Sequence, residues 1–204
     1  MTGRMQHEPL RHYVSDHGLV AGCDEAGRGC LAGPVFAAAV ILPDHPSAGL
    51  SSRLNDSKKL RPAHRSQLRH MIEEQAVAFG VAMVGNEEID RINILQASIR
   101  AMHLALDQLM PRPGMVLVDG NRFLPYQNLP HRCMVRGDAT WLSIAAASVL
   151  AKTWRDEHME DQHKTFPSYE WKKNKGYPTA AHREAIAKYG PSPIHRKTFR
   201  LLYG

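Results

Sequence analysis

The sequence has few cysteines, and they are not arranged to build a disulfide framework or a metal site. Cys23, Cys30 and Cys133 are odd in number and form no CxxC pair, which argues against a disulfide scaffold and against a zinc ribbon. The 12 histidines form no HExxH motif, so no histidine-based metal cluster is indicated. We therefore expect a protein of a reducing compartment.

Long hydrophobic runs are also missing. The longest, residues 35–42, is far shorter than the roughly 20 apolar residues of a membrane-spanning helix. The N-terminal residues are polar and contain no apolar signal-peptide core. Internal repeats and low-complexity tracts are absent as well. We expect a soluble, cytoplasmic, monomeric protein with no membrane partner.

Acidic residues are outnumbered by basic ones. The chain has 26 Lys and Arg against 20 Asp and Glu, a formal net charge of +6. This excess suits a polyanionic partner, because each neutralised phosphate releases condensed counterions. Charge alone does not decide the matter, since many basic proteins never bind nucleic acid. The length of 204 residues and the 43% of hydrophobic residues fit one globular domain with a real core.

Apolar residues along the chain predict strands and helices in alternation. Short apolar runs predict strands over 19–23, 34–42, 79–84, 115–118 and 132–135. Apolar residues at helical spacing predict helices over 61–78, 92–110, 141–163, 180–188 and 195–202. Strands first, then strand–helix alternation, predict an α/β fold with a mixed sheet flanked by helices.

Three carboxylates follow predicted strands at positions where such a fold places chemistry. Asp24 and Glu25 follow the strand 19–23, and Asp119 follows the strand 115–118. Ligand sites in open α/β sheets lie beyond the carboxyl ends of strands. If the two strands are neighbours, they are about 5 Å apart and these carboxylates could share one cation; oxygen ligands suit Mg²⁺. For any one acid taken alone, a plain role in capping a turn stays open.

A fourth acidic ligand has to be chosen between Asp138 and Asp156. Asp138 precedes the helix 141–163, whereas Asp156 lies late on it. At the rise of an α-helix the two are separated by roughly 20 Å or more, too far to serve one metal pair. Asp138 follows a strand, as the other acids do, and is the better ligand. Asp156 is interpreted as a structural hydrogen-bonding partner.

Several motifs carry a family resemblance. The stretch CDEAGRG at 23–29 resembles the opening motif of the type 2 ribonucleases H, the bacterial ribonuclease HII group. Later blocks are similar to that family's in the same order: NDSKKL at 55–60, NIL at 93–95, DGN at 119–121, RGD at 136–138, SIAAASVLAK at 143–152, KGYPT at 175–179 and HRKTF at 195–199. The resemblance covers about residues 19–199. Cys30 stands where many members have Pro, and Thr198 where many have Ser.

The resemblance implies a ribonuclease-H-like fold with a small C-terminal helical region. We expect a catalytic domain over 1–164 and a C-terminal helical region over 165–204 that packs on it and contacts substrate. Because the segment before the first strand is short, we expect no additional N-terminal domain of the kind found in the related type 3 enzymes. Residues 145–147 should form close helix–sheet packing, and His182 and His195 should be surface or hydrogen-bonded structural residues.

The resemblance also implies the reaction and the metal ligands. Asp24, Glu25, Asp119 and Asp138 match the residues that hold two divalent ions, Mg²⁺ or Mn²⁺, with Asp24 bridging them. The two ions would activate water and stabilise the leaving oxygen. The implied activity is hydrolysis of the RNA strand of RNA–DNA hybrids, and of single ribonucleotides embedded in duplex DNA, giving 5′-phosphate and 3′-hydroxyl ends.

Recognition of RNA has to involve the 2′-hydroxyl, which separates ribose from deoxyribose. Gly27, Arg28 and Gly29 directly follow the acidic pair, and glycine lets a backbone come close to a ligand. The resemblance implies that this segment contacts the 2′-hydroxyl through backbone groups. Spacing alone also allows a plain glycine turn with a solvated arginine.

Two further groups are assigned by the resemblance. Tyr177 would lie against the deoxyribose that follows the ribonucleotide and sense an RNA–DNA junction; the alternative is an aromatic anchor of the C-terminal region. Asn55, Ser57 and Lys58 resemble a loop that holds a phosphate; a simple polar turn is the alternative.

Two other functions stay open from the sequence. A non-catalytic hybrid-binding module is one, although four acids facing a phosphodiester would then be unfavourable without metal. A different ribonuclease-H-like nuclease, such as a DNA resolvase, is the other.

Overall fold

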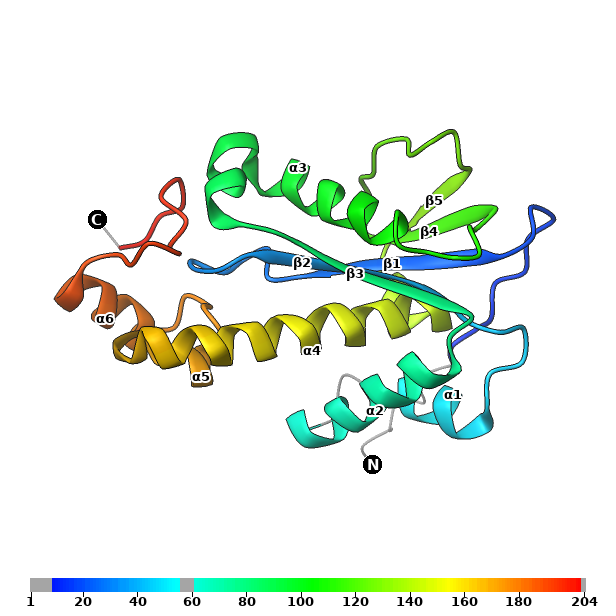
Figure 1. The fold of residues 1–204 in the computed structure, drawn as a ribbon, viewed down its shortest axis with the longest axis horizontal. Helices are drawn as coiled ribbons and strands as arrows, with labels where there is room; N and C mark the ends of the chain where they lie inside the picture. Colours follow the sequence, from blue (N-terminus) through cyan, green and yellow to red (C-terminus); the bar gives the residue numbers. More distant parts are fainter. Residues whose placement is uncertain (1–8, 56–60, 203–204) are drawn as a thin grey trace, which may run out of the picture.

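Five strands form one mixed sheet in the computed structural model of the chain (Figure 1). The structure describes residues 9–55 and 61–202, without the side chains of residues 62 and 63. The strands are β1 (Val20–Ala26), β2 (Val35–Ile41), β3 (Ala78–Val84), β4 (Met115–Asp119) and β5 (His131–Met134). Their order is β3-β2-β1-β4-β5, which confirms the predicted mixed α/β sheet.

Strand β1 lies at the centre and has a different kind of neighbour on each side. It pairs antiparallel with β2, which pairs antiparallel with β3. On its other side it pairs parallel with β4, which pairs parallel with β5. The carboxyl ends of β1, β4 and β5 therefore point to one edge of the sheet, where ligand sites lie in such folds.

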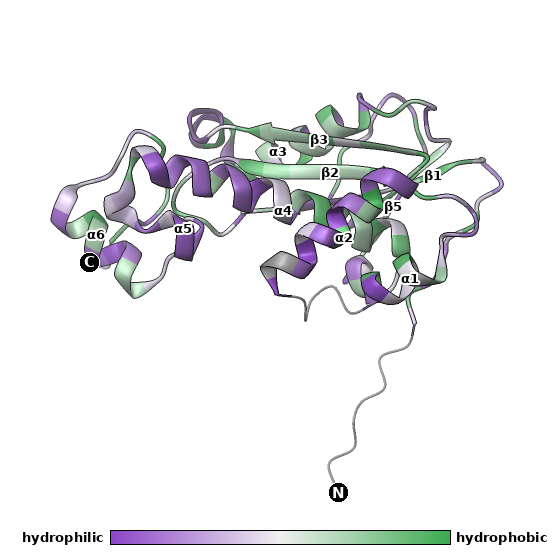
Figure 2. Cartoon of the chain, turned by 60° about the horizontal axis from the view of Figure 1, so that its bottom comes forward, coloured by the Kyte–Doolittle hydropathy of each residue, from purple (hydrophilic) through white to green (hydrophobic). Residues whose placement is uncertain are grey.

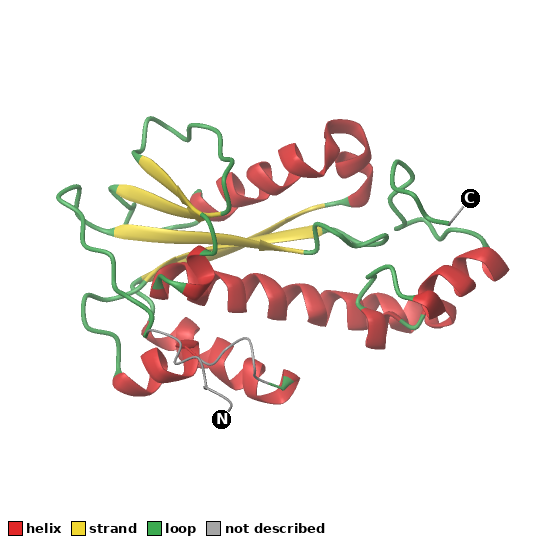
Figure 3. Ribbon diagram, turned by 180° about the vertical axis from the view of Figure 1, so that it is seen from behind, coloured by secondary structure: helices red, strands yellow, loops and turns green. Residues whose placement is uncertain are grey.

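Helices cover both faces of the sheet (Figures 1 and 3). The helix on one face is α3 (Asn86–Leu106), and those on the other are α4 (Leu142–Thr165), α1 (Ala48–Asn55) and α2 (Pro62–Gln75). In β2 the side chains of Ala37 and Ala39 face α3, and those of Ala38 and Val40 face α4, because successive side chains of a strand point to opposite faces. Both faces of β2 are thus buried, which explains its continuous apolar run.

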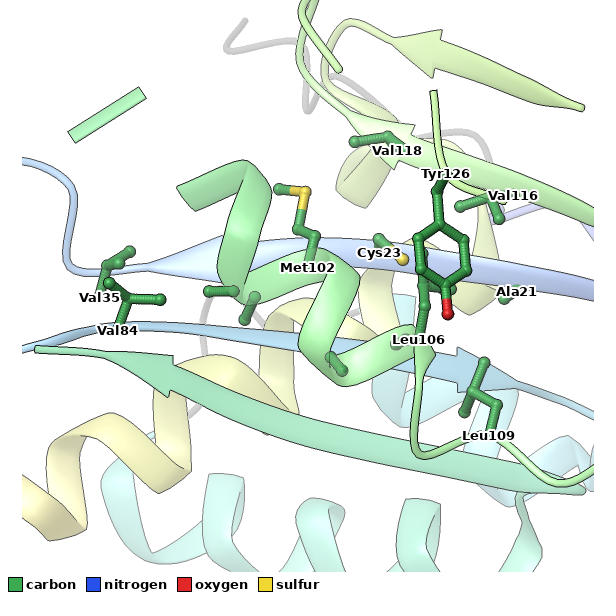
Figure 4. Close-up of a cluster of buried hydrophobic side chains, with 14 of the residues drawn as sticks. Ala21, Cys23, Val35, Val84, Met102, Leu106, Leu109, Val116, Val118 and Tyr126 are labelled. Carbon is green, nitrogen blue, oxygen red and sulfur yellow. The ribbon is translucent and has the colours of Figure 1, made fainter. Parts of the chain in front are cut away.

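The core on the α3 side is closed by residues from both halves of the sheet (Figure 4). Met102 and Leu106 of α3 pack over Cys23 of β1 and Val118 of β4. Tyr126, in the loop after β4, covers the end of this core. Figure 2 shows the contrast in hydropathy between the apolar β2 and the hydrophilic outer surfaces of α2 and of the second half of α4. No described helix has the length and apolar character needed to span a bilayer.

Strand β1 and helix α4 approach each other unusually closely. A Cβ atom at Gly22 would lie 2.3 Å from the main-chain carbonyl carbon of Ser143, so only glycine fits there. Ala145, Ala146 and Ala147 are buried in the same core. The predicted close helix–sheet packing at 145–147 is confirmed, and small residues on both elements explain it.

The chain beyond α4 forms a small helical region at one end of the molecule (Figure 1). It contains α5 (Trp171–Asn174) and α6 (Ala180–Tyr189). Its apolar side chains share a core with Leu31 and Ala32, which follow β1, and with Met159 of α4. Because this core includes residues from both sides of the boundary, the division into 1–164 and 165–204 stays a prediction.

The helix predicted over 195–202 is wrong. His195 instead forms an isolated β-bridge with Ala32, and the amide of Arg196 donates to the carbonyl of Leu31 (2.8 Å). Asp90 accepts hydrogen bonds from the amides of Lys197 and Thr198 at 2.8 and 3.0 Å. These partners hold the segment in a non-helical conformation.

Smaller differences concern the ends of elements. The sequence did not predict α1 or α5, which are short and rich in Ser, Gly, Lys and Asn. Helix α3 begins at Asn86, earlier than expected, and is kinked at Asn93 (φ 65°). The side chain of Asn93 caps the second half of α3 by accepting from the amides of Leu95 and Gln96.

Candidate metal centre and recognition loop

Asp24 and Asp119 lie on neighbouring strands at the same edge of the sheet. The parallel pairing of β1 with β4 puts Cys23 opposite Val118, so the next residue on each strand is an aspartate. Asp24 and Glu25 are the fifth and sixth of the seven residues of β1, and Asp119 is the last of β4. The prediction that these acids follow their strands was therefore slightly wrong: antiparallel pairing with β2 extends β1 as far as Ala26.

Asp24 is the most buried of the four acids, with 6% of its surface exposed. Its Oδ1 accepts a hydrogen bond of 2.7 Å from the amide of Glu25, and its carboxylate also accepts one from the hydroxyl of Ser148 on α4. Burial raises the pKa of Asp24 well above its usual range, and the nearby charges of Glu25 and Asp119 raise it further. A bound cation would offset both effects.

Glu25 and Arg28 form a salt bridge at the mouth of the site. The Nη1 atom of Arg28 lies 3.0 Å from Oε1 of Glu25. Burial raises the pKa of Glu25, Arg28 lowers it, and the charge of Asp119 raises it. Glu25 thus interacts both with the cationic side chain of Arg28 and with the other acids of the site.

Asp138 is brought to the site by a tight turn after β5. Arg136 adopts a left-handed conformation (φ 58°) at the start of a short 3₁₀ helix, Gly137–Ala139. The pKa of Asp119 is raised by burial and by the charge of Asp138, and the hydrogen bond from the amide of Gly137 opposes that shift. Asp119 thus lies within electrostatic range of the other three acids predicted from the sequence.

A cleft of about 180 Å³ opens beside Glu25 and Asp119. Its walls include Glu25, Asp119, Arg28 and Arg122, and α3 contributes Ser98. The buried hydroxyl of Ser98 has no hydrogen-bond partner among the described residues. Acidic and basic side chains thus face one polar cleft that is large enough for a small ligand or a phosphate group.

The donor set fits a hard divalent cation. All four candidate ligands are carboxylates, and Mg²⁺ and Mn²⁺ take oxygen ligands. In the described part of the chain, no three acidic, His or Cys side chains converge closely enough to hold an ion as they stand. Each carboxylate instead uses a partner in the chain, such as Arg28 for Glu25 and the amide of Gly137 for Asp119. The chemistry of the four donors fits such an ion.

The segment that directly follows the acids combines a buried and an exposed glycine. Gly27 is buried with φ +96°, and a Cβ atom there would lie 2.0 Å from Nε of Arg155. Gly29 is exposed, and a Cβ atom there would meet nothing within 4 Å. Gly27 is thus required by packing, whereas Gly29 leaves its backbone open to a ligand.

Tyr177 lies beside the same segment. Its hydroxyl and the thiol of Cys30 form a side-chain hydrogen bond, and the carbonyl of Gly176 accepts a bond of 2.8 Å from the amide of Leu31. Tyr177 is 38% exposed, and Lys152 and Arg155 lie 5.5 and 5.8 Å from the centre of its ring. Part of the ring is held by the chain and part is free to contact a substrate.

Only one of the three residues predicted to hold a phosphate lies in the part of the chain that the structure describes. Asn55 is the exposed last residue of α1, and Ser57 and Lys58 lie outside the described residues. Asp156 accepts a hydrogen bond from Lys152, as expected of a structural partner. His182 and His195 are buried: His182 accepts a hydrogen bond from Trp171, His195 accepts one from the amide of Ser192, and their Nε2 atoms lie 3.2 Å apart, which confirms the interpretation of them as structural residues.

Sequence reasoning missed the groups that hold these acids in place, above all Ser148 and Gly137. Ser148 lies one helical turn after Ile144, whose main chain contacts Gly22. Side chains at i and i+4 share a helix face, so helical spacing was a usable signal for Ser148. Gly137 carried no such signal, because its role depends on a contact between separate strands.

The sheet order and the carboxylates at the adjacent ends of β1 and β4 define the ribonuclease-H-like class of nucleases. A family model described as Ribonuclease HII matches residues 21–203. A "Ribonuclease HII" of Christiangramia forsetii is 60% identical over 183 residues, covering 90% of this chain and 91% of that protein. One of Parabacteroides distasonis is 56% identical over 193 residues, covering 95% and 96%.

A solved structure agrees with these relatives. The crystal structure of ribonuclease H2 from Pyrococcus horikoshii OT3 superposes with a TM-score of 0.75 at 26% identity, covering 90% of this chain and 94% of that one. The chain belongs to the ribonuclease HII family.

Proposed function

We propose that Asp24, Glu25, Asp119 and Asp138 hold two divalent ions with which this chain, a ribonuclease H endonuclease, hydrolyses the RNA strand of RNA–DNA hybrids. We extend the substrates to single ribonucleotides embedded in duplex DNA, and the products to 5′-phosphate and 3′-hydroxyl ends. The ions are Mg²⁺ or Mn²⁺. The single observation that best supports this is the register of β1 and β4, which makes Asp24 and Asp119 neighbours across parallel strands.

Each acidic residue has a distinct position relative to the cleft. Asp24 is buried between the other acids and α4, so its carboxylate would be available to both ions. Glu25 and Asp119 line the cleft, and Asp138 approaches Asp119 from the turn after β5. When bound, divalent ions lower the pKa of coordinated water and neutralise charge on the phosphodiester. Arg28 and Arg122 in the cleft wall orient the phosphate backbone by charge-assisted hydrogen bonds.

The selectivity for ribose comes from the segment Gly27–Arg28–Gly29. The open backbone at Gly29 lets a 2′-hydroxyl approach its main-chain groups. Tyr177, beside this segment, packs its exposed ring face on the following deoxyribose. Asn55, Ser57 and Lys58 hold a phosphate further along the strand, and the C-terminal region over 165–204 contributes the junction contact through Tyr177.

The test uses duplexes that carry one ribonucleotide, an all-RNA strand or no ribonucleotide, each incubated with Mg²⁺, with Mn²⁺ or with EDTA. Cleavage of both ribonucleotide substrates with either metal, and of nothing with EDTA, supports the proposal. Binding of hybrids without cleavage in any metal indicates a hybrid-binding module instead. Cleavage of the all-DNA duplex or of a four-way junction indicates a resolvase-like nuclease.

A cytoplasmic monomer is part of the same proposal. Light scattering at several protein concentrations, with and without a hybrid, tests the monomer directly. A mass twice that of the chain at every concentration contradicts it.

A further inference from the structure

Arg196 is a fully buried arginine whose guanidinium makes hydrogen bonds only to main-chain carbonyls among the described residues. Its guanidinium donates to the carbonyls of Gly27 (2.8 Å), Arg28 (2.9 Å) and Gly33 (3.0 Å). All three belong to the segment that connects β1 to β2. The side chain of a residue near the C-terminus therefore holds, by hydrogen bonds, the segment that follows Asp24 and Glu25.

Arg155 of α4 forms hydrogen bonds with the other end of the same segment. It is also fully buried and donates to the carbonyls of Ala32 (3.2 Å) and Pro34 (3.1 Å). A third bond of 2.8 Å reaches the carbonyl of Lys175, which lies in the stretch that carries Tyr177. Its side chain occupies the space that a Cβ atom at Gly27 would fill.

Burying two arginines in this way costs desolvation free energy, so a contribution to stability alone does not explain it. Among the described residues, no carboxylate lies within salt-bridge distance of Arg155 or Arg196, although both are buried. Burial lowers the pKa of Arg196 to about 10, and the charge of Arg155 contributes to the shift. Buried cations without an ionic partner are rare, because desolvation is expensive. Each nitrogen of the two guanidinium groups has a carbonyl partner, which indicates that the two arginines fix the conformation of the segment.

The geometry of the peptide bond shows where this conformation directs the amides of the segment. In a trans peptide the C=O and N–H groups of one unit point in opposite directions, and the only cis bond among the described residues is Met110–Pro111. The carbonyl of Gly27 and the amide of Arg28 share one unit, and the carbonyl of Arg28 and the amide of Gly29 share the next. Since both carbonyls point to Arg196, both amides point away from it. Neither amide donates to any described residue, and both residues are exposed.

We propose that Arg196, braced by Arg155, is a positioning residue that presents the amides of Arg28 and Gly29 to the ribose 2′-hydroxyl. The inference rests on the proposed function, in which this segment reads the 2′-hydroxyl. Arg196 is itself held from two sides: its own amide donates to Leu31, and Asp90 holds the two residues that follow it. The C-terminal segment thus takes part in sugar recognition without touching the substrate.

The test is a binding ratio measured without cleavage. In an Asp119→Asn background, fluorescence anisotropy gives the affinities for a duplex with one ribonucleotide and for the same duplex with deoxyribose at that position. Arg196→Lys keeps the charge but cannot bind three carbonyls in a planar fork. It should bring the ribose preference down towards one, by up to about tenfold for one well-aligned hydrogen bond, while affinity for the all-deoxy duplex stays unchanged.

Arg183→Lys is the matched control. Arg183 also donates to two main-chain carbonyls, but these are the carbonyls of Arg200 and Leu201 and not those of the segment between β1 and β2. It should keep the ribose preference. If Arg196→Lys does not fold, Arg155→Lys takes its place, since it loosens the same segment from the other end. A folded variant that melts early yet binds the two duplexes in the wild-type ratio overturns the inference.

Failure of the proposed function has a different signature. If the parent protein itself shows no ribose preference, 2′-hydroxyl reading by this segment is wrong and the inference is overturned with it. If the parent discriminates and Gly29→Pro, which removes one amide, abolishes discrimination while Arg196→Lys does not, only the role of Arg196 is wrong.

Discussion

The amide nitrogen of Gly137 donates a hydrogen bond of 2.7 Å to Oδ1 of Asp119. This bond joins the end of β4 to the turn that carries Asp138, so two carboxylates from different segments are held by a main-chain group. Gly137 has no room for a side chain: a Cβ atom there would lie 2.5 Å from Cδ1 of Ile144 and 3.0 Å from Cβ of Met134. The position of Asp138 relative to Asp119 therefore depends on a glycine.

Gly137→Ala should impair cleavage more than it impairs folding. The added methyl group has to displace the turn, at a cost of about 1–3 kcal/mol in the free energy of unfolding, and Asp138 moves with the turn. Gly85→Ala is the matched control, because a Cβ atom there meets nothing within 4 Å. Urea denaturation and single-turnover cleavage measure the two effects. A Gly137→Ala protein with full activity would show that the turn does not set the metal site.

Asp119→Asn and Asp138→Asn should each reduce cleavage by about 100-fold or more, with the fold intact. An amide preserves the shape of the side chain, and removing a charge relieves the repulsion that raises the pKa of Asp119. The thermal midpoint without metal should therefore not fall. The rise in midpoint on adding Mn²⁺, which measures binding to the folded state, should shrink. Substantial activity at saturating metal in either variant removes that residue from the ligand set.

The sequence was sufficient for the strands and for placing the acids close to strand ends. Strand β2 and helix α4 have strong apolar patterns, and Asp24 and Asp119 come at the ends of apolar runs, which is a local property. The pairing of β1 with β4, which makes these acids neighbours, is non-local; the apolar pattern left it open, and the family resemblance implied only the fold and the set of ligands.

The parts that could not be predicted depend on contacts between distant segments. Residues 195–202 have helical spacing, but Asp90 and the carbonyl of Leu31 compete successfully for their amides. The burial of Arg155 and Arg196 is equally invisible in the sequence, where an arginine is normally taken for a solvated residue. Local patterns cannot reveal which carbonyls a long side chain will reach.

Lowering the pH should reduce the free energy of unfolding, because the buried His195 has a lower pKa in the folded chain. This buried ring accepts hydrogen bonds of 2.8 Å from the amide and hydroxyl of Ser192, and lies 3.2 Å from the ring of His182. Burial, and then the charge of His182, lower the pKa of His195 from 6.5 to about 4. Between those values the unfolded chain takes up a proton that the folded chain does not. The free energy of unfolding should fall as pH falls through this window, by roughly 2 kcal/mol at about pH 5.

His195→Gln tests this assignment by urea denaturation at about pH 7 and about pH 5. The variant should be less stable at the higher pH, and its stability should change less between the two. The same substitution at exposed His17 serves as the control and should leave the pH dependence unchanged. An unchanged pH dependence in His195→Gln would assign the acid sensitivity to other groups.

Affinity for a hybrid should fall steeply with salt concentration, because phosphate contacts dominate binding. Arg122 in the cleft wall should contribute one such contact, so Arg122→Gln should reduce the slope of log affinity against log salt by about one. Arg112, in the loop before β4 near the opposite end of the strands, is the matched control and should leave the slope unchanged. A flat plot for the parent protein would mean that the basic surface does not face nucleic acid.

Tyr177 is the residue for which anchoring and recognition have to be separated by experiment. Its carbonyl accepts from the amide of Thr179 (2.8 Å) and lies 2.9 Å from Nδ1 of His182, so the main chain is held independently of the ring. The ring itself is partly exposed beside Lys152 and Arg155. Loss of the ring should therefore affect the substrate more than the fold.

Tyr177→Ala should sharply reduce cleavage at a single embedded ribonucleotide and blur the preference for the RNA–DNA junction, because a flat apolar face against the deoxyribose is lost. Tyr177→Phe should retain more of both if the ring face matters more than the hydroxyl, and it also removes the bond to Cys30. Rates on single-ribonucleotide and all-RNA substrates have to be compared below the thermal midpoint of each variant. If Tyr177→Ala melts early yet cuts both substrates in the wild-type ratio, the ring is an anchor for the C-terminal region, because a lost sugar contact has to change that ratio and a lost anchor does not.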